Sequence, residues 1–261
     1  METGDTGFCR CELCQARREH PEPDAVQSWD DMALMYPMAT AAIKSVSPEA
    51  YLLLETYTHP MRAFGEGVPE WIGETVRGFP EGTVVQWVSD GYVEPRADNA
   101  WTEAGTVSNA RHGNVMRTHM ATTWMYQRRE VAVDWLADMV GRSMAHGFDG
   151  VSMFGEDSPF HAGSELNYLA LEHYGSPANP TAELDLFLDE VAAPLLGGEE
   201  LARRYLAIAR LQKQPELISN ALVEVGQIAG KLAPDQARRW LWLGNFLASY
   251  EWEGRQGDQV I

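Results

Sequence analysis

The feature that most constrains this fold is an alternation of apolar, strand-like runs with helix-like segments between residues 29 and 156. The apolar runs predict strands buried on both faces, over 51–57, 84–89, 115–120 and 151–155. A helical period in the intervening chain predicts helices over 29–46, 68–78 and 128–146. Because parallel strands need a long crossover, usually a helix, this alternation predicts an α/β protein with a parallel sheet.

Beyond residue 164 the pattern predicts helices alone, over 164–174, 181–195, 199–213, 215–232 and 234–250. We therefore expect two domains, a partial (β/α) barrel over 1–163 and an all-α region over 164–261. Trp240 and Trp242 lie two positions apart in the last helix, so at most one of them can face its core.

Two architectures fit an alternating parallel pattern, a doubly wound sheet and a (β/α)8 barrel. No G-x-G-x-x-G and no P-loop is present, so a nucleotide-binding doubly wound sheet has no direct support. Polar residues end the predicted strands, as in barrel enzymes, whose chemistry lies at the C-terminal ends of several strands. We expect four strands plus the end of a fifth at 2–5, which predicts the C-terminal half of a barrel and a chain that begins within a larger fold.

A family resemblance supports the barrel. The segment Glu2-Thr3-Gly4-Asp5, followed by Cys9-x-Cys11-x-x-Cys14, resembles the loop after the fourth strand in bacterial glycoside-hydrolase-like barrels related to α-glucuronidases and β-hexosaminidases. Residues 150–160 are similar to the last strand of that family, and 165–172, followed by 180–181 and 187–197, resemble its closing helices. The resemblance implies a fragment of a larger enzyme that hydrolyses glycosidic bonds. The alternative is a non-catalytic carbohydrate-binding pseudoenzyme or a split-barrel interaction protein.

Glycoside hydrolysis needs two carboxyl groups that flank the sugar. The catalytic candidates are Asp5, Glu55 and Glu156, because each is expected at a strand end that faces the barrel mouth. The substrate-binding candidates are further carboxylates, aromatic platforms for sugar rings and histidines that bond hydroxyl groups: Glu2, Tyr57, His59, Trp87, Asp90, His119 and Trp124. Among 38 acidic residues, the alternative for any single one is a solvated loop position or a helix N-cap.

All three cysteines of the chain lie in one C-x-C-x-x-C cluster. Thiolates bind Zn²⁺ when a fourth ligand joins them, and the nearest candidate is His20. We therefore predict a structural zinc site of Cys9, Cys11, Cys14 and His20, with sulfur atoms within roughly 4 Å of one another. The alternative is a buried, reduced turn in which the cysteines are small apolar fillers. A dithiol redox role is not expected, because nothing in the sequence marks a helix start at this C-x-x-C.

Charge and composition restrict the partners. The formal net charge of -18 and the pI near 4.7 argue against nucleic acid, whose phosphates need clustered Lys and Arg. We expect no membrane partner, because no apolar run approaches a membrane span in length. The acidic N-terminus is unlike a signal peptide, and the cysteine cluster suits a reducing compartment, which favours the cytoplasm. A half-barrel exposes an edge strand, so we also expect self-association through that edge.

Overall fold

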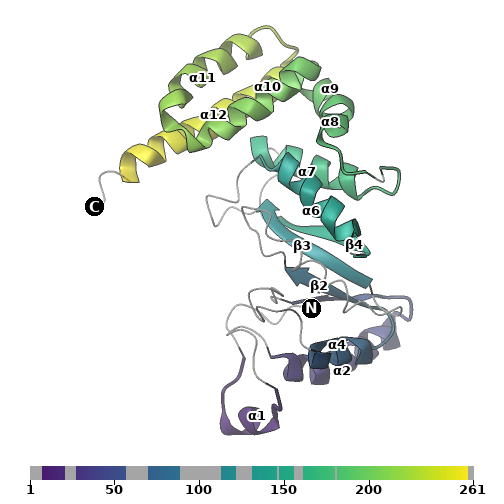
Figure 1. Ribbon diagram of the computed structural model, residues 1–261. Coiled ribbons are helices and arrows are strands. Elements are labelled where there is room, and N and C mark those ends of the chain that lie inside the picture. Colours follow the sequence, from purple (N-terminus) through teal and green to yellow (C-terminus); the bar gives the residue numbers. More distant parts are fainter. Residues whose placement is uncertain are drawn as a thin grey trace. The chain divides into compact units, whose positions relative to one another are not determined.

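The computed structural model of the chain describes residues 8–20, 28–56, 70–88, 113–121, 131–145, 147–155, 161–179 and 181–257 (Figure 1). The chain divides into two compact units. The first unit comprises Met1–Thr118 and Gly141–Ser152, and the second comprises His119–Val140 and Met153–Ile261. Among the described helices, none has both the length and the apolar character needed to cross a membrane.

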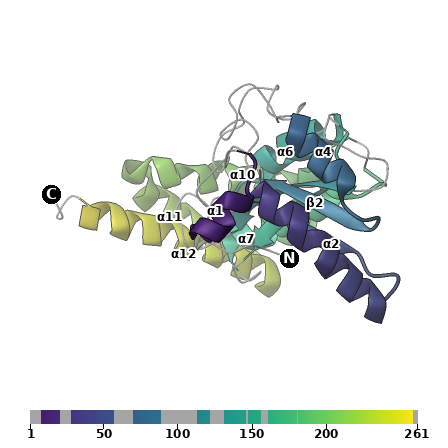
Figure 2. The ribbon, with the colours of Figure 1, turned by 90° about the horizontal axis from the view of Figure 1, so that it is seen from below.

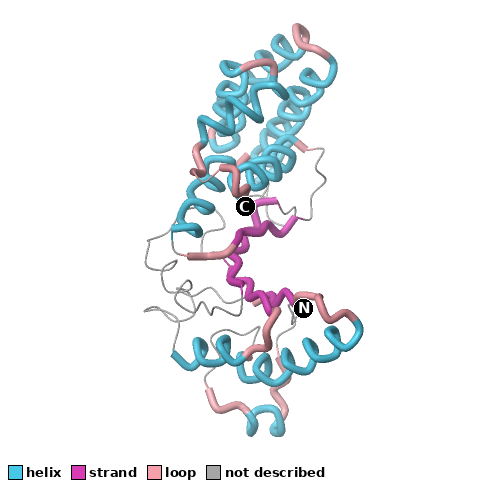
Figure 3. Tube along the Cα trace, turned by 90° about the vertical axis from the view of Figure 1, so that its right-hand side faces the viewer, coloured by secondary structure: helices cyan, strands magenta, loops and turns pink. Residues whose placement is uncertain are grey.

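A four-stranded sheet contains β1 (Leu52–Glu55), β2 (Thr83–Val88), β3 (Gly113–Ala121) and β4 (Gly150–Gly155), as the magenta strands of Figure 3 show. The order in the sheet is β1-β2-β3-β4, which repeats the order in the chain without a reversal. β1 runs parallel to β2, and β2 runs parallel to β3. The predicted parallel α/β sheet is thereby confirmed.

Helices α1 (Glu12–Arg17), α2 (Trp29–Val46) and α4 (Glu70–Gly78) belong to the first unit, and α6 (Val133–Ala145) lies between β3 and β4 in the chain. The bounds of α2 agree with the predicted helix over 29–46. Its start is fixed by Ser28, whose Oγ accepts a hydrogen bond from the Asp31 N–H at 3.2 Å, an N-cap that satisfies one otherwise unpaired helix donor.

The core of the first unit lies between one face of the sheet and the helices α2 and α4. Side chains of a strand alternate between faces, and the strand register places five buried apolar residues on this face: Leu52, Leu54, Val85, Trp87 and Met116. The helices cover them with Trp29, Met32, Tyr36, Ile72 and Val76. Trp29 stacks on Trp87 with ring centroids 5.6 Å apart. Burying each large side chain contributes roughly 2 kcal/mol, so this layer dominates the stability of the unit.

The second unit ends in a run of helical segments: α7 (Ala162–Gly175), α8 (Leu184–Phe187), the π-helical turn η2 (Leu188–Ala192), α9 (Ala193–Leu196), α10 (Glu199–Ala209), the 3-10 turn η3 (Arg210–Lys213), α11 (Pro215–Ala229) and α12 (Pro234–Gly257). The described chain beyond residue 161 contains helices and turns and no strand, as predicted. Gly197 ends α9 with φ +104°, and a Cβ there would lie 2.7 Å from a methyl group of Leu232, so only glycine fits this turn.

Trp240 occupies the centre of the helical core. It is fully buried, its Nε1 donates to the Leu196 carbonyl at 3.0 Å, and its ring meets Tyr205 edge to face at 5.2 Å. Trp242 is half-buried, with the Arg238 guanidinium 5.4 Å from its ring. The two tryptophans therefore divide as predicted, one in the core and one near the surface.

Candidate functional site

The second face of the sheet carries polar side chains where the first face is apolar. The register places Glu55 of β1 beside Gln86 of β2, and Arg117 of β3 on the same face. Arg117 forms an ion pair with Glu55, which joins β1 to β3. Gln86 Nε2 donates to Ser152 Oγ at 2.6 Å, which joins β2 to β4. Each of these two contacts therefore passes over one intervening strand.

The Glu55–Arg117 pair is largely withdrawn from water, because Arg117 is 1% exposed and the Glu55 side chain is 16% exposed. A guanidinium remains protonated in proteins, so Glu55 faces a permanent positive charge. Removing both charges from water is costly, and their mutual attraction offsets part of that cost. Thr56 holds the end of β1 beside the pair, since its N–H and its Oγ1 both donate to the Gln86 carbonyl at 3.1 and 2.8 Å.

Of the predicted catalytic carboxylates, only Glu55 lies in the described part of the chain, at the C-terminal end of β1. Asp5 and Glu156 lie outside the described residues, as do Glu2, Tyr57, His59, Asp90 and Trp124. The backbone of His119 belongs to β3, but its side chain is also outside the described set.

Trp87 requires a correction. It was predicted to offer a flat surface to a sugar, but it is fully buried against Trp29, on the face of the sheet opposite to Glu55. The reason is the two-residue period of a strand: Gln86 shares the face of Glu55, so the next residue must point the other way.

The cysteine cluster lies at the start of α1. The three sulfur atoms lie within 4.8 Å of one another, somewhat wider than the predicted 4 Å. Cys9 and Cys11 are exposed and Cys14 is half-buried, so the interpretation as buried apolar fillers is wrong for the first two. α1 begins at Glu12 with Cys11 as its N-cap, so the C-x-x-C does stand at a helix start, contrary to the expectation from sequence.

The thiols of this cluster differ in acidity. The pKa of Cys11 is lowered to about 7, chiefly because the backbone N–H of Cys14 favours its thiolate, with help from the thiols of Cys9 and Cys14. The pKa of Cys14 is raised to about 11, chiefly because its interactions with the side chains of Cys11 and Cys9 favour the protonated form. Of Cys11 and Cys14, Cys11 therefore ionises first.

The structure does not bring His20 to the cysteines. Its Nδ1 lies 2.8 Å from Asp30 Oδ1, and its ring stacks on Trp71 at 4.2 Å and 7°. Among the described residues, the group that could hold a metal ion at this place consists of Cys9, Cys11 and Cys14. Three thiolates can bind a metal ion that takes its remaining ligand from elsewhere.

Two consecutive aspartates anchor the cysteine segment to the first turn of α2, beside which α1 lies (Figure 2). Asp30 accepts hydrogen bonds from the N–H groups of Glu19 and His20 at 2.7 and 2.9 Å. Asp31 accepts from the guanidinium groups of Arg17 and Arg18 at 2.6 and 2.5 Å. Burial opposes ionisation of both carboxyls, but the hydrogen bond of the His20 ring with Asp30, together with these hydrogen bonds, outweighs it and the pKa of each is lowered.

This anchor should weaken in acid. Because the pKa of Asp31 is lower in the folded protein than in the unfolded chain, its contribution is fully present above the unfolded value of about 4 and is lost as pH falls through the folded value. We expect Asp31→Asn to cost about 1–2 kcal/mol at neutral pH and almost nothing at the most acidic pH that the fold tolerates. Urea unfolding over a pH series measures the difference. Asp185→Asn, at an exposed ion pair with Arg203, is the control, and a pH-independent cost for Asp31→Asn would contradict the assignment.

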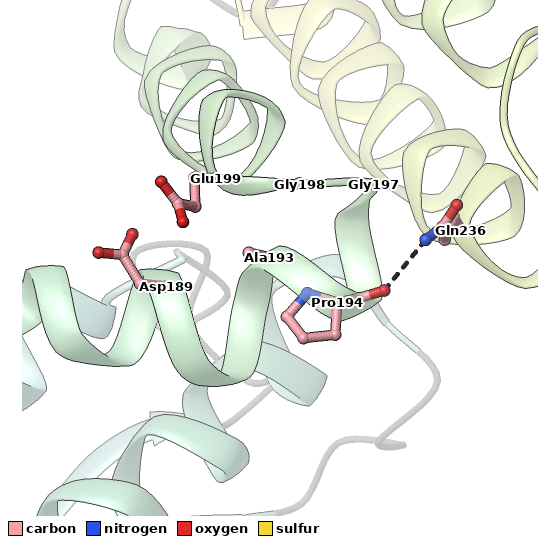
Figure 4. A pocket seen from close by; sticks show the side chains of 7 residues that line it. All are labelled: Asp189, Ala193, Pro194, Gly197, Gly198, Glu199 and Gln236. Carbon is pink, nitrogen blue, oxygen red and sulfur yellow. Dashed lines mark hydrogen bonds between the residues drawn. The ribbon is translucent and has the colours of Figure 1, made fainter.

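The second unit contains a pocket. Asp189, Glu199 and Gln236 line it together with the turn around Gly197 (Figure 4). Two of its polar side chains already have partners, because Asp189 accepts from Arg203 at 2.7 Å and Gln236 donates to the Pro194 carbonyl at 3.1 Å. It therefore offers no reactive group comparable to the thiols or to the Glu55–Arg117 pair.

Sequence reasoning missed Arg117, Gln86 and Ser152 as members of the polar face. One signal was present, because Arg117 stands inside the predicted strand 115–120, where an unpaired charge would be costly. Its partner could not be identified from the sequence, since the two residues lie 62 positions apart and on strands that are not neighbours.

In comparisons with known proteins, no family model matches this chain, and no curated protein or solved structure matches it.

Proposed function

We propose that this protein is glycoside-hydrolase-like, acts on carbohydrate glycosidic bonds and contains part of a (β/α)8 barrel. The strand order supports the barrel. A doubly wound sheet reverses its strand order at a switch point, whereas the strands of a barrel follow one another in chain order. The described strands follow the chain order throughout. The remaining strands of such a barrel would pair beyond the outer edges of β1 and β4.

The observation that carries this proposal is the pair of contacts between alternate strands. In a (β/α)8 barrel the interior is filled by layers of side chains from alternate strands. In a flat sheet, strands two apart are separated by about 9.6 Å, which only long side chains can span. The Gln86–Ser152 bond and the Glu55–Arg117 pair both join alternate strands on one face, which supports a concave, barrel-like interior there.

The ion pair suggests a role for Glu55. A carboxylate beside a guanidinium remains ionised, and an ionised carboxylate serves as nucleophile or base rather than as the acid that protonates the leaving group. The general acid would then be Asp5 or Glu156. The same pairing also favours the second candidate, a non-catalytic carbohydrate-binding or split-barrel interaction protein, because Glu55 is already engaged by Arg117.

An assay of the full chain against a panel of aryl glycosides tests the proposal. If Glu55 is the nucleophile or base, Glu55→Gln should lower turnover by roughly 10²–10⁴-fold. Glu70→Gln, at an exposed position on α4, is the matched control and should retain full rate. Calorimetric binding of the same glycosides without turnover would support the non-catalytic candidate. If the protein neither hydrolyses nor binds any of these glycosides, both candidate functions are refuted.

We further propose that the cysteine cluster holds a structural zinc ion. Zinc–sulfur bonds of about 2.3 Å in a tetrahedron place the sulfurs about 3.8 Å apart, so sulfurs within 4.8 Å need only a small contraction. The fourth ligand would be water, or His20 after it leaves Asp30 and Trp71. The exposure of Cys9 and Cys11 is compatible with water at that position.

Protein purified without chelator should contain about one zinc ion per chain. Cys11→Ser should lower zinc affinity at least tenfold, as the loss of a thiolate ligand would. His20→Ala should leave the affinity unchanged if water is the fourth ligand. Elemental analysis gives the zinc content, and competition with a chromophoric chelator gives the zinc affinity of each variant. Absence of zinc from the unmodified protein would contradict the site.

Self-association is proposed at the β1 edge. Beside it, α2 exposes a second apolar stripe opposite its buried one, comprising Leu34, Met35, Met38 and Val46. A helix that is apolar on both sides is normally buried on both. We expect the protein to associate in a sedimentation dilution series, and Met38→Glu, at a residue 67% exposed, should weaken association at least tenfold. Val223→Glu, at an exposed position of α11, is the control, and a monodisperse monomer would contradict the expectation.

A further inference from the structure

Cys11 and Cys14 occupy the N-cap and the third residue of α1. Residues three apart on a helical turn have Cβ atoms about 5–6 Å apart. A disulfide holds the two Cβ atoms about 3.5–4.5 Å apart, so the turn must tighten by about 1–2 Å for the bond to form. The two sulfurs already lie within 4.8 Å of each other, so side-chain rotation with a small adjustment of the turn can bring them to bonding distance.

We propose that Cys11 and Cys14 form a thiol–disulfide exchange site, which low-molecular-weight disulfides oxidise and low-molecular-weight thiols reduce. The proposal depends neither on the carbohydrate activity nor on zinc, because it uses only the placement of these two thiols. It reverses the expectation from sequence, in which a helix start at this C-x-x-C was missing.

Exposure sets the order of the two steps. Cys11 is exposed and Cys14 is half-buried, so an external disulfide reaches Cys11 first. The Cys11 thiolate attacks one sulfur of the external disulfide, the S–S bond breaks, and one thiolate leaves and takes up the proton that Cys11 lost. The Cys14 thiolate then attacks the Cys11 sulfur and expels the second thiolate, which takes up the proton from Cys14. Two protein thiols are thus oxidised and one external disulfide is reduced.

Cys9 is a poorer partner for Cys11. In extended chain, residues two apart have Cα atoms about 6.6 Å apart, at the upper limit of the disulfide range. Cys9 and Arg10 lie outside helix and strand, and Cys9 stands outside the helical turn that holds Cys14. Cys9 should therefore remain a free thiol after oxidation.

The anchor on α2 keeps this turn in place during exchange. Arg17 and Arg18, at the end of α1 and just after it, are held by Asp31, and the Arg18 guanidinium also lies 4.5 Å from the Phe8 ring centroid. These contacts hold the residues before and after the cysteines in place, and none of them involves a cysteine sulfur atom. The two thiols are therefore presented in a fixed arrangement, which favours ring closure over separate modification of each thiol.

The test uses the full chain, reduced, treated with chelator and equilibrated in mixtures of reduced and oxidised glutathione. Free thiols are alkylated, and peptide mass mapping locates the disulfide. We expect one Cys11–Cys14 bond and one free thiol, Cys9. Cys9→Ser should give the same bond. In Cys14→Ser the glutathione adduct on Cys11 should last at least about tenfold longer, since the resolving thiol is missing.

Three results would overturn the proposal: separate glutathione adducts on all three cysteines, a Cys9–Cys11 bond as the main product, or an adduct lifetime unchanged in Cys14→Ser. A parallel sample loaded with zinc separates this proposal from the zinc site. Slower oxidation with zinc than without it supports both, whereas oxidation at the same rate supports exchange and counts against zinc binding.

Discussion

Arg117→Met should lower the free energy of unfolding of the first unit by about 3 kcal/mol. The substitution leaves the Glu55 carboxylate largely buried without its guanidinium partner, and an uncompensated buried charge is far more costly than a lost surface contact. Arg77→Met on α4 is the matched control, because that arginine makes an exposed ion pair with Glu70, and its loss should cost less than about 1 kcal/mol.

The double variant Glu55→Met/Arg117→Met should recover most of this loss, since it removes both charges together. Urea unfolding combined with hydrogen exchange at the amides of β1 to β3 separates this unit from the helical one. Equal costs for Arg117→Met and Arg77→Met would show that the Glu55–Arg117 pair does not stabilise the sheet. That result would also weaken the argument for a polar barrel interior.

Trp240→Ala should lower the free energy of unfolding of the second unit by about 3–5 kcal/mol. The substitution leaves a cavity beside Tyr205 and removes the donor that satisfies the buried Leu196 carbonyl. Leu241→Ala is the control, because the next residue of α12 is 53% exposed and its truncation should cost less than about 0.5 kcal/mol.

Hydrogen exchange of the amides in α9 and α12 reports the local effect of Trp240→Ala, since these helices meet at the Trp240–Leu196 bond. We expect exchange there to accelerate in Trp240→Ala and to remain unchanged in Leu241→Ala. If the two variants lose equal stability, Trp240 is not the centre of this core.

Local patterns in the sequence were enough to predict the elements after residue 28, although not α1. The helix over 29–46, the four apolar strands and the series of helices after residue 164 all follow from apolar periodicity, which depends on neighbours within one or two turns. The parallel sheet followed from the same alternation, because each crossover needs a helix. One of the two tryptophans of α12 had to leave the core for the same reason, since residues two apart on a helix do not share a face.

Contacts between distant residues could not be predicted in this way. Both faces of β2 carry apolar residues, so the sequence could not show that Trp87 faces the helices while Gln86 faces Ser152; a shift of one residue exchanges the faces. His20 was the nearest metal ligand along the chain, but Asp30 and Trp71 hold it in the fold. Neither partner is close to His20 in sequence.

The sequence by itself determined the helices and strands between residues 29 and 250, that the strands run parallel, and that three thiols lie within six residues of one another; it did not predict α1. The tertiary structure decided the order of the strands, the pairing of Glu55 with Arg117 and the packing of Trp87 against Trp29. It also fixed the residues that follow α1, because Asp31 binds Arg18 and Asp30 accepts from the His20 N–H. The physical reason is that periodicity acts between near neighbours, whereas charge pairing and face selection depend on residues that only folding brings together.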